Sequence, residues 1–150
     1  MALLEVTFYE NGEINPKLFD DIAKEIASNL VKREKYQDKN GKQKEKVIGV
    51  SRNQFRKIYQ DVKQLERSFK KNKNFNSIFP SLKMIKPKTA YLVAKIKDND
   101  KNKKYYDNFL NFITTTIDKI NPPRDFEVFC LFLEAVYAYY YSLGGSKTEE

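Results

Sequence analysis

The sequence predicts an all-α fold: a bundle of about five helices, to which a short extended N-terminal arm can be added. Apolar residues recur at helical spacing along most of the chain, and turn-forming residues separate these runs. With 150 residues, of which 41% are hydrophobic, the chain is long enough to bury one core. We expect an arm at 1–14, a single helical-bundle domain at 15–143 and a disordered tail at 144–150.

The N-terminal arm alternates, so that Leu4, Val6 and Phe8 fall on one side of an extended chain. Asn11-Gly12 follows and is a strong turn signal. No second strand is expected after it, because Asn15-Pro16 is typical of a helix start. A lone strand leaves its backbone groups unpaired, so the arm is either irregular or completed by another chain.

The first helix is expected from about Pro16 to Tyr36. Its apolar face would consist of Leu18, Phe19, Ile22, Ile26 and Leu30. The polar, lysine-rich stretch 36–46 contains Gly41 and predicts an exposed, mobile loop. Such a loop could hold phosphates or simply be solvated, and the sequence favours solvation.

The second helix, from Ser51 to Lys71, has two separate faces. Ser51 and Gln54 stand at capping-box spacing. One face is apolar and consists of Phe55, Ile58, Val62, Leu65 and Phe69. The other, here called the basic stripe, consists of Arg52, Arg56, Lys63, Arg67 and Lys70.

The basic stripe is a candidate site for RNA. Its residues lie one to two turns apart, or roughly 5–10 Å, which suits successive backbone phosphates. Asp61 falls on the far side and Glu66 only borders the stripe, whereas a face built for solubility usually mixes the two signs. An ordinary solvated helix face is the alternative.

Three more helices are expected after an asparagine-rich break at 72–80. A short one begins near Pro87 and runs through Ile96, and another covers about Lys103 to Ile120. The last helix runs from about Arg124 to Leu143. Gly144-Gly145 is its expected stop.

The last helix is apolar on nearly all sides, with only Glu127 and Glu134 forming a polar wedge. Such a helix is either central in a bundle or buried by a partner. A membrane span is disfavoured, because charged residues interrupt the run. Together with the unpaired arm, any apolar surface left uncovered would favour self-association, such as a homodimer.

Composition favours a polyanionic partner and argues against catalysis. The chain has 28 Lys+Arg against 20 Asp+Glu, a net charge of +8 and no histidine. Without histidine the commonest general base is missing, and the one cysteine, Cys130, lies in an apolar run and is expected to be buried. Asp20-Asp21 and Asp98-Asn99-Asp100 are better explained as helix-dipole partners and solvated acids than as a metal site. We expect no cofactor, no metal, no membrane contact and, without a secretion signal, a cytoplasmic location.

Three segments, in the same order, resemble the small helical subunit of type III-A CRISPR-Cas effector complexes. They are Ser51-Arg52-Asn53-Gln54-Phe55-Arg56-Lys57-Ile58-Tyr59, Met84-Ile85-Lys86-Pro87-Lys88-Thr89-Ala90-Tyr91, and the Phe132-Leu133-Glu134-Ala135 run within 129–139. The family usually has arginine four residues after the tyrosine of the second segment, where this chain has Lys95. The arm at 3–14 matches no motif of the family.

The resemblance implies a non-catalytic, all-α subunit that lies beside CRISPR RNA paired to target RNA and contacts other subunits of the complex. Its segments add Lys57, Lys86, Lys88 and Lys95 to the five RNA-binding candidates of the basic stripe. Pro87 at a helix start would also present Lys86 and Lys88 beside free backbone N–H groups. Two alternatives stay open: a helical protein–protein module without a nucleic-acid role, and a nuclease with a carboxylate-bound metal.

Overall fold

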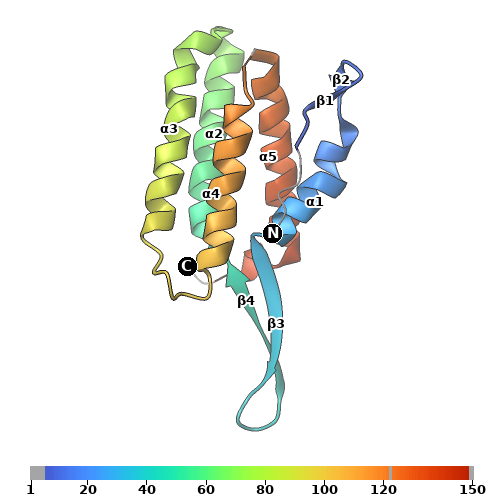
Figure 1. Ribbon diagram of the computed structural model, residues 1–150, viewed down its shortest axis with the longest axis vertical. Helices are drawn as coiled ribbons and strands as arrows, with labels where there is room; N and C mark the ends of the chain where they lie inside the picture. The colour runs from blue at the N-terminus through green and yellow to red at the C-terminus, as the bar shows by residue number, and fades with distance from the viewer. Residues whose placement is uncertain (1–5, 122, 149–150) are drawn as a thin grey trace.

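The computed structural model describes residues 6–121 and 123–148. Four long helices run up and down side by side: α2 (Arg52–Asn72), α3 (Phe75–Ala94), α4 (Lys103–Asp118) and α5 (Pro123–Leu143) (Figure 1). A shorter helix, α1 (Asp21–Ser28), follows the 3-10 turn η1 (Pro16–Phe19) and packs against α5. The described residues also contain two small two-stranded sheets, so the fold is mostly helical rather than all-α.

Helix α5 is central, because α1 covers one side of it and α2 another. Its inward residues Phe126, Phe129, Phe132 and Tyr140 are fully buried. The apolar face predicted for α2 is buried as expected, except that Leu65 is only half-buried. Of the two alternatives left open for the last helix, the central position in the bundle is therefore the one that this chain adopts.

A second strand follows the Asn11-Gly12 turn, so the prediction of a lone strand is wrong. Strand β1 (Tyr9–Glu10) pairs with β2 (Glu13–Ile14). Asn11 and Gly12 both have positive φ, which a two-residue hairpin turn requires. A strand of two residues is too short to show alternation. Val6 and Phe8 are buried in the chain's own core, while Leu4 lies outside the described residues.

The helix predicted at 16–36 ends early. After α1 the chain enters strand β3 (Val31–Gln37), which pairs antiparallel with β4 (Gln43–Gly49). The apolar helical pattern stops at Leu30, and the six residues after Val31 are charged or polar apart from Tyr36. A ribbon that is exposed on both faces has no apolar period, so hydrophobic patterning cannot detect it.

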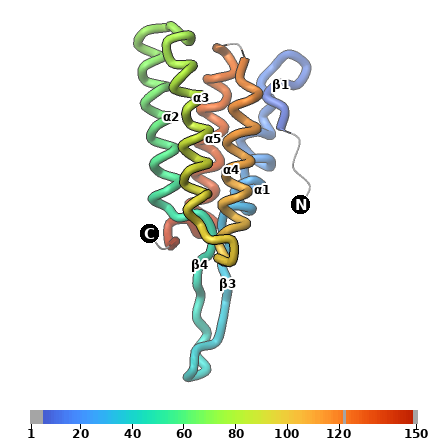
Figure 2. The backbone as a smooth tube through the Cα atoms, turned by 60° about the vertical axis from the view of Figure 1, so that its left-hand side comes forward, coloured from blue at the N-terminus to red at the C-terminus, as the bar shows by residue number. Residues whose placement is uncertain are grey.

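The β3–β4 hairpin projects from one end of the bundle, as Figures 1 and 2 show from two directions. The stretch 36–46, predicted as a mobile loop, is mostly strand. The turn is tight, because the Asp38 carboxylate accepts hydrogen bonds from the amides of Asn40 and Lys42 at 2.9 Å each. The hairpin leads directly into α2 through Val50 and Ser51.

Helix α3 contains both Pro80 and Pro87, so the predicted helix start at Pro87 is wrong and the break predicted over 72–80 is too long. The real break is the short turn at Lys73-Asn74, where Lys73 adopts a left-handed conformation. Each proline removes one helical hydrogen bond. Both prolines are exposed, so the carbonyls that lose a partner can be hydrated.

The described part of the predicted tail is ordered. Gly145–Lys147 forms the 3-10 turn η2, and Gly145 and Thr148 are buried. The Thr148 hydroxyl accepts a hydrogen bond from the Arg52 amide at 2.7 Å, and the Tyr140 hydroxyl donates to the Val50 carbonyl at 2.5 Å. These contacts fix the end of the chain to the start of α2. Residues 149–150 of the predicted tail lie outside the described residues.

Candidate nucleic-acid interface

The basic stripe lies on the outer side of α2, next to α5. Helix α2 begins as predicted, because the Ser51 hydroxyl accepts a hydrogen bond from the Gln54 amide at 3.2 Å. Phe55 packs against Phe109, Tyr137 and Tyr140, with ring centroids 4.8–4.9 Å apart. This packing fixes the rotation of α2 and thereby the direction in which the stripe faces.

Two members of the stripe are engaged within the chain. Lys63 pairs with Glu66 at 3.2 Å and with Glu134 of α5 at 3.6 Å. Partial burial lowers the pKa of Lys63. The hydrogen bond and the negative charge of Glu66 raise it by more, so the pKa of Lys63 lies above its usual value. The Arg52 guanidinium donates to the Ser146 carbonyl at 2.9 Å. Because two glutamates lie beside Lys63, the middle of the stripe carries little net positive charge, whereas Arg52 at its start keeps its charge.

The other three members, Arg56, Arg67 and Lys70, are exposed. Among residues 6–121 and 123–148, no carboxylate lies within ion-pairing distance of any of them. Arg56 and Arg67 are separated by three helical turns, or about 16 Å along the axis. These side chains can each take a phosphate without breaking an existing ion pair.

Lys57 and Lys88 lie on a different surface, between α2 and α3. Lys88 reaches back to Asp61 of α2, with the two charged atoms 3.6 Å apart. Lys57 is exposed on the same side of α2 as Asp61. Both candidates therefore point away from the basic stripe.

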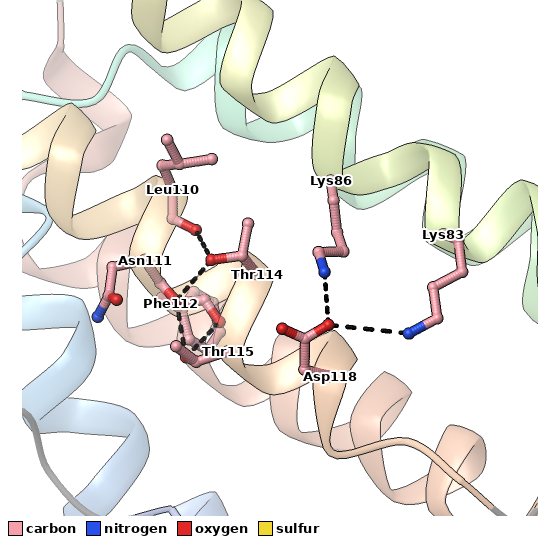
Figure 3. A network of polar contacts seen from close by, with 8 residues as sticks. All are labelled: Lys83, Lys86, Leu110, Asn111, Phe112, Thr114, Thr115 and Asp118. Carbon is pink, nitrogen blue, oxygen red and sulfur yellow. Dashed lines mark hydrogen bonds and ion pairs between the residues drawn. The ribbon is translucent and has the colours of Figure 1, made fainter.

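Lys86 faces α4 and is bound to a carboxylate. Figure 3 shows Lys86 and Lys83 reaching from α3 to Asp118 near the end of α4. The Lys86 ammonium is 2.5 Å from the Asp118 carboxylate, and that of Lys83 is 3.7 Å away. Because Lys86, Pro87 and Lys88 lie inside α3, the expected display of two lysines at a helix N-terminus is wrong.

Lys95 caps the C-terminal end of α3, with its ammonium 4.2 Å from the ring centroid of Tyr91. Tyr91 is 64% exposed and Met84, on the same outer face, is 52% exposed. The nine candidates therefore divide among several surfaces. The basic stripe keeps five of them on one side of α2, of which Arg56, Arg67 and Lys70 are exposed.

The sequence analysis recognised the lysine-rich stretch 36–46 as a possible phosphate contact but not as part of a basic two-stranded hairpin that spans residues 31–49. Between residues 31 and 49 there are seven Lys or Arg and three Asp or Glu, a net charge of +4. That is half of the net charge of the chain. Lysines alternate with other residues at 42–46, which places them on one face of a strand. This face can be recognised only once the segment is known to be a strand.

Comparison with protein families identifies the chain. A family model described as Csm2 Type III-A matches residues 14–146. The chain belongs to this family. The match confirms the resemblance drawn from the three segments, and family membership implies a subunit of a type III-A CRISPR effector complex. Comparisons with curated proteins and with solved structures find no match.

Three further features of this Csm2-family chain can be stated for the part that the structure describes: its cysteine, its metal-type residues and the character of its helices. Cys130 is buried as expected, and burial, followed by the negative charge of Glu66, raises the pKa of its thiol. No three Cys, Asp or Glu residues gather closely enough within 6–121 and 123–148 to hold a metal ion. Over the same residues, no helix has the length and apolar character needed to cross a membrane.

The Lys86–Asp118 pair predicts a measurable titration. Its hydrogen bond is the largest cause of the lowered pKa of Asp118, to which Lys83 also contributes. In Lys86→Gln we expect this pKa to rise toward the ordinary value of about 3.9, as followed by carboxyl chemical shifts in NMR. A lowered folded-state pKa stabilises the protein above the unfolded-state pKa, and this stabilisation is lost as the pH falls through the folded-state value.

Asp118 is 54% exposed, so the stabilisation is at most about 1 kcal/mol. Lys119→Gln is the matched control, because Lys119 is also exposed and forms no ion pair with the described residues. An Asp118 pKa that is equally low in wild type and Lys86→Gln would contradict the assignment of the shift to Lys86.

Proposed function

We propose that the chain is a non-catalytic structural subunit of a type III-A CRISPR effector complex that holds RNA by its backbone through α2. One observation carries the RNA contact: Arg56, Arg67 and Lys70 are exposed on one side of a helix whose rotation is fixed by the core, and no described carboxylate pairs with them. Family membership supplies the complex. The absence of histidine from the sequence supports a non-catalytic role.

The contact we propose is to phosphates of CRISPR RNA and target RNA. Arginine and lysine on a helix surface neutralise phosphates without reading bases, so the contact positions the RNA and carries little sequence information. In an RNA-guided complex, base pairing with the guide supplies the specificity. A row of about 16 Å between Arg56 and Arg67 spans several nucleotides of a strand.

Contacts with other subunits, or with a second copy of this chain, belong to the same proposal. We place them on the outer face of α3, where Met84 and Tyr91 are exposed. Large exposed apolar residues on one face are typical of protein contacts. The arm gives no further support for a homodimer, because Val6 and Phe8 are buried within the chain.

A binding titration with single-stranded RNA tests the RNA contact. Replacing Arg56, Arg67 and Lys70 with alanine should reduce the slope of log K against log salt by about 2, because each neutralised phosphate contributes about 0.7. Affinity for unrelated RNA sequences should fall by a similar factor. The measurement is fluorescence anisotropy at several salt concentrations.

The matched control replaces Lys17, Lys24 and Lys119, which are exposed elsewhere and carry the same total charge. If the control lowers the slope as much as the α2 variant does, only net charge matters and the α2 contact is wrong. A wild type without salt-dependent RNA affinity would favour the helical protein–protein module. RNA cleavage on addition of Mg²⁺ would favour the nuclease alternative.

A further inference from the structure

A hollow of about 490 Å³ lies where the β3–β4 hairpin leaves the bundle. Strands β3 and β4, the loop between α3 and α4, and the C-terminal turn η2 form its walls. Figure 1 shows that the hairpin base, this loop and the C-terminal turn all gather at the same end of the bundle. The volume falls within the range of roughly 300–1,000 Å³ that is usual for small-ligand sites.

Hydrogen bonds within the chain fix the walls of this hollow. The Asn102 side chain accepts a hydrogen bond from the Gly49 amide at 2.8 Å and so ties β4 to the α3–α4 loop. The Arg33 guanidinium donates to the carbonyls of Leu143 at 3.2 Å and Ser142 at 3.4 Å, which ties β3 to the end of α5. The hairpin base is therefore held in place before any ligand arrives.

The lining is strongly cationic. Lys46, Lys101 and Lys147 come from three separate segments, and Arg33 is a fourth cation of the lining. The Lys46 ammonium lies 3.9 Å from the Glu34 carboxylate, which is not itself part of the lining. Glu45 is the one acidic residue among the described lining residues, and it is bound to Arg33 at 3.0 Å. Lys101 and Lys147 are exposed and form no ion pair within 6–121 and 123–148. Two lysines without an ion pair, converging from different elements, favour a phosphate.

An aromatic ring completes the hollow. Tyr36 of β3 lines the hollow and is 42% exposed. The Lys46 ammonium lies 5.7 Å from the centroid of the Tyr36 ring. An exposed tyrosine beside cationic side chains is the usual arrangement of single-stranded nucleic-acid sites, in which a base stacks on the ring while the backbone meets the charges. A strand passing along the hollow would find both.

We propose that this hollow binds one nucleotide of single-stranded RNA, with its phosphate held by Lys101 and Lys147 and its base stacked on Tyr36. The site lies at the end of α2 that carries Arg52 and Arg56, because β4 leads directly into α2. It therefore extends the α2 contact around the end of the bundle. The inference rests on the proposed RNA-binding function and adds a place where a base, not only a phosphate, is held.

Charge removal tests the phosphate contact. In the full-length chain, Lys101→Ala with Lys147→Ala should lower the affinity for a single-stranded oligouridine about tenfold at low salt and reduce the salt slope by about 1.4. The control is Lys39→Ala with Lys42→Ala, which removes the same charge from the hairpin tip outside the hollow. Equal losses in the two variants, or no loss in the first, would overturn the proposal.

Stacking is tested separately. Tyr36→Ala should weaken binding at least about fivefold and Tyr36→Phe should keep it, since the ring and not the hydroxyl stacks. Tyr91→Ala, at another exposed tyrosine, is the control. If inorganic phosphate competes as well as uridine monophosphate, or Tyr36→Ala binds like wild type, the hollow holds a phosphate alone and the base contact is wrong. Displacement by polyglutamate but not by uridine monophosphate would assign the hollow to an acidic protein.

The two RNA contacts fail independently. If the Arg56, Arg67 and Lys70 variant binds like wild type while the Lys101 and Lys147 variant is weakened, the α2 contact is wrong and the hollow stands. The reverse result removes the hollow and leaves the proposed function intact. Circular dichroism of each variant checks that the fold is unchanged.

Discussion

Replacing Phe55 with alanine is expected to lower the free energy of unfolding by about 3–5 kcal/mol, the usual cost of removing a buried phenylalanine. The Phe55 side chain is fully buried. Its ring meets Phe109 of α4 and both Tyr137 and Tyr140 of α5, so three helices lose a common contact. Urea unfolding followed by circular dichroism measures the change.

Tyr91→Ala is the matched control, because it also truncates an aromatic residue of a helix, but one that is 64% exposed. We expect it to change the free energy of unfolding by less than about 1 kcal/mol. A loss below about 1.5 kcal/mol in Phe55→Ala would contradict a core centred on α2, α4 and α5. Because Arg56 adjoins Phe55, the same variant should also weaken RNA binding if loosening of α2 moves the basic stripe.

Replacing Gly49 with alanine is expected to destabilise the protein by roughly 2–6 kcal/mol, the sum of overpacking and backbone strain. Gly49 has φ of +142°, and a Cβ added there would lie 2.4 Å from the Leu30 carbonyl oxygen and 2.7 Å from the Val31 Cα. These are backbone atoms, which cannot rotate away as a side chain can. Thermal and urea unfolding measure the loss.

Gly41→Ala separates the two causes. Gly41 also has positive φ, at +77°, but no atom lies within 4 Å of an added Cβ. The Gly41→Ala variant should therefore lose only about 1–2 kcal/mol of unfolding free energy, the cost of a left-handed backbone conformation for alanine. Similar losses at the two glycines would show that close approach at Gly49 is not the main cause. If the hollow holds RNA, Gly49→Ala should also weaken RNA binding, because Gly49 anchors β4 to Asn102.

The sequence predicted the helices whose apolar face is buried and whose ends carry clear signals. Helix α2 was expected at 51–71 and is found at Arg52–Asn72, and α5 was expected at 124–143 and is found at Pro123–Leu143. In both, a one-sided or continuous apolar pattern coincides with a cap or a stop. Local and tertiary preferences agree there, and so periodicity is sufficient.

The elements that were predicted wrongly are ones whose decisive residues are exposed to solvent. The β3–β4 hairpin has polar residues on both faces, so nothing in its pattern distinguishes it from a loop or a helix end. In α3, Pro80 and Pro87 are strong helix-breaking signals, yet both stand on the solvent side, and the buried side of the helix continues past them. Tertiary packing outweighed the local preference of the two prolines.

Only part of the candidate site could be predicted from the sequence. A wheel of α2 identifies the basic stripe from the sequence, since α2 is regular and its apolar side fixes its rotation. It cannot show that Lys63 lies beside Glu134, which is 71 positions further along the chain. Nor can it show that Tyr36, Lys101 and Lys147 line one hollow, because that depends on how three separate segments meet at one end of the bundle.

The packing of α1 against α5 affects the order in which the chain can fold during translation. Ser28, the last residue of α1, leaves the ribosome long before Pro123, the first residue of α5. At synthesis rates of about 5–20 residues per second, this delay lasts roughly 5–20 s. Helices α2, α3 and α4 are neighbours in sequence and can pair within that time, whereas α1 has to wait for its partner. Until α5 is made, the apolar side of α1 is open to chaperones or to another nascent chain.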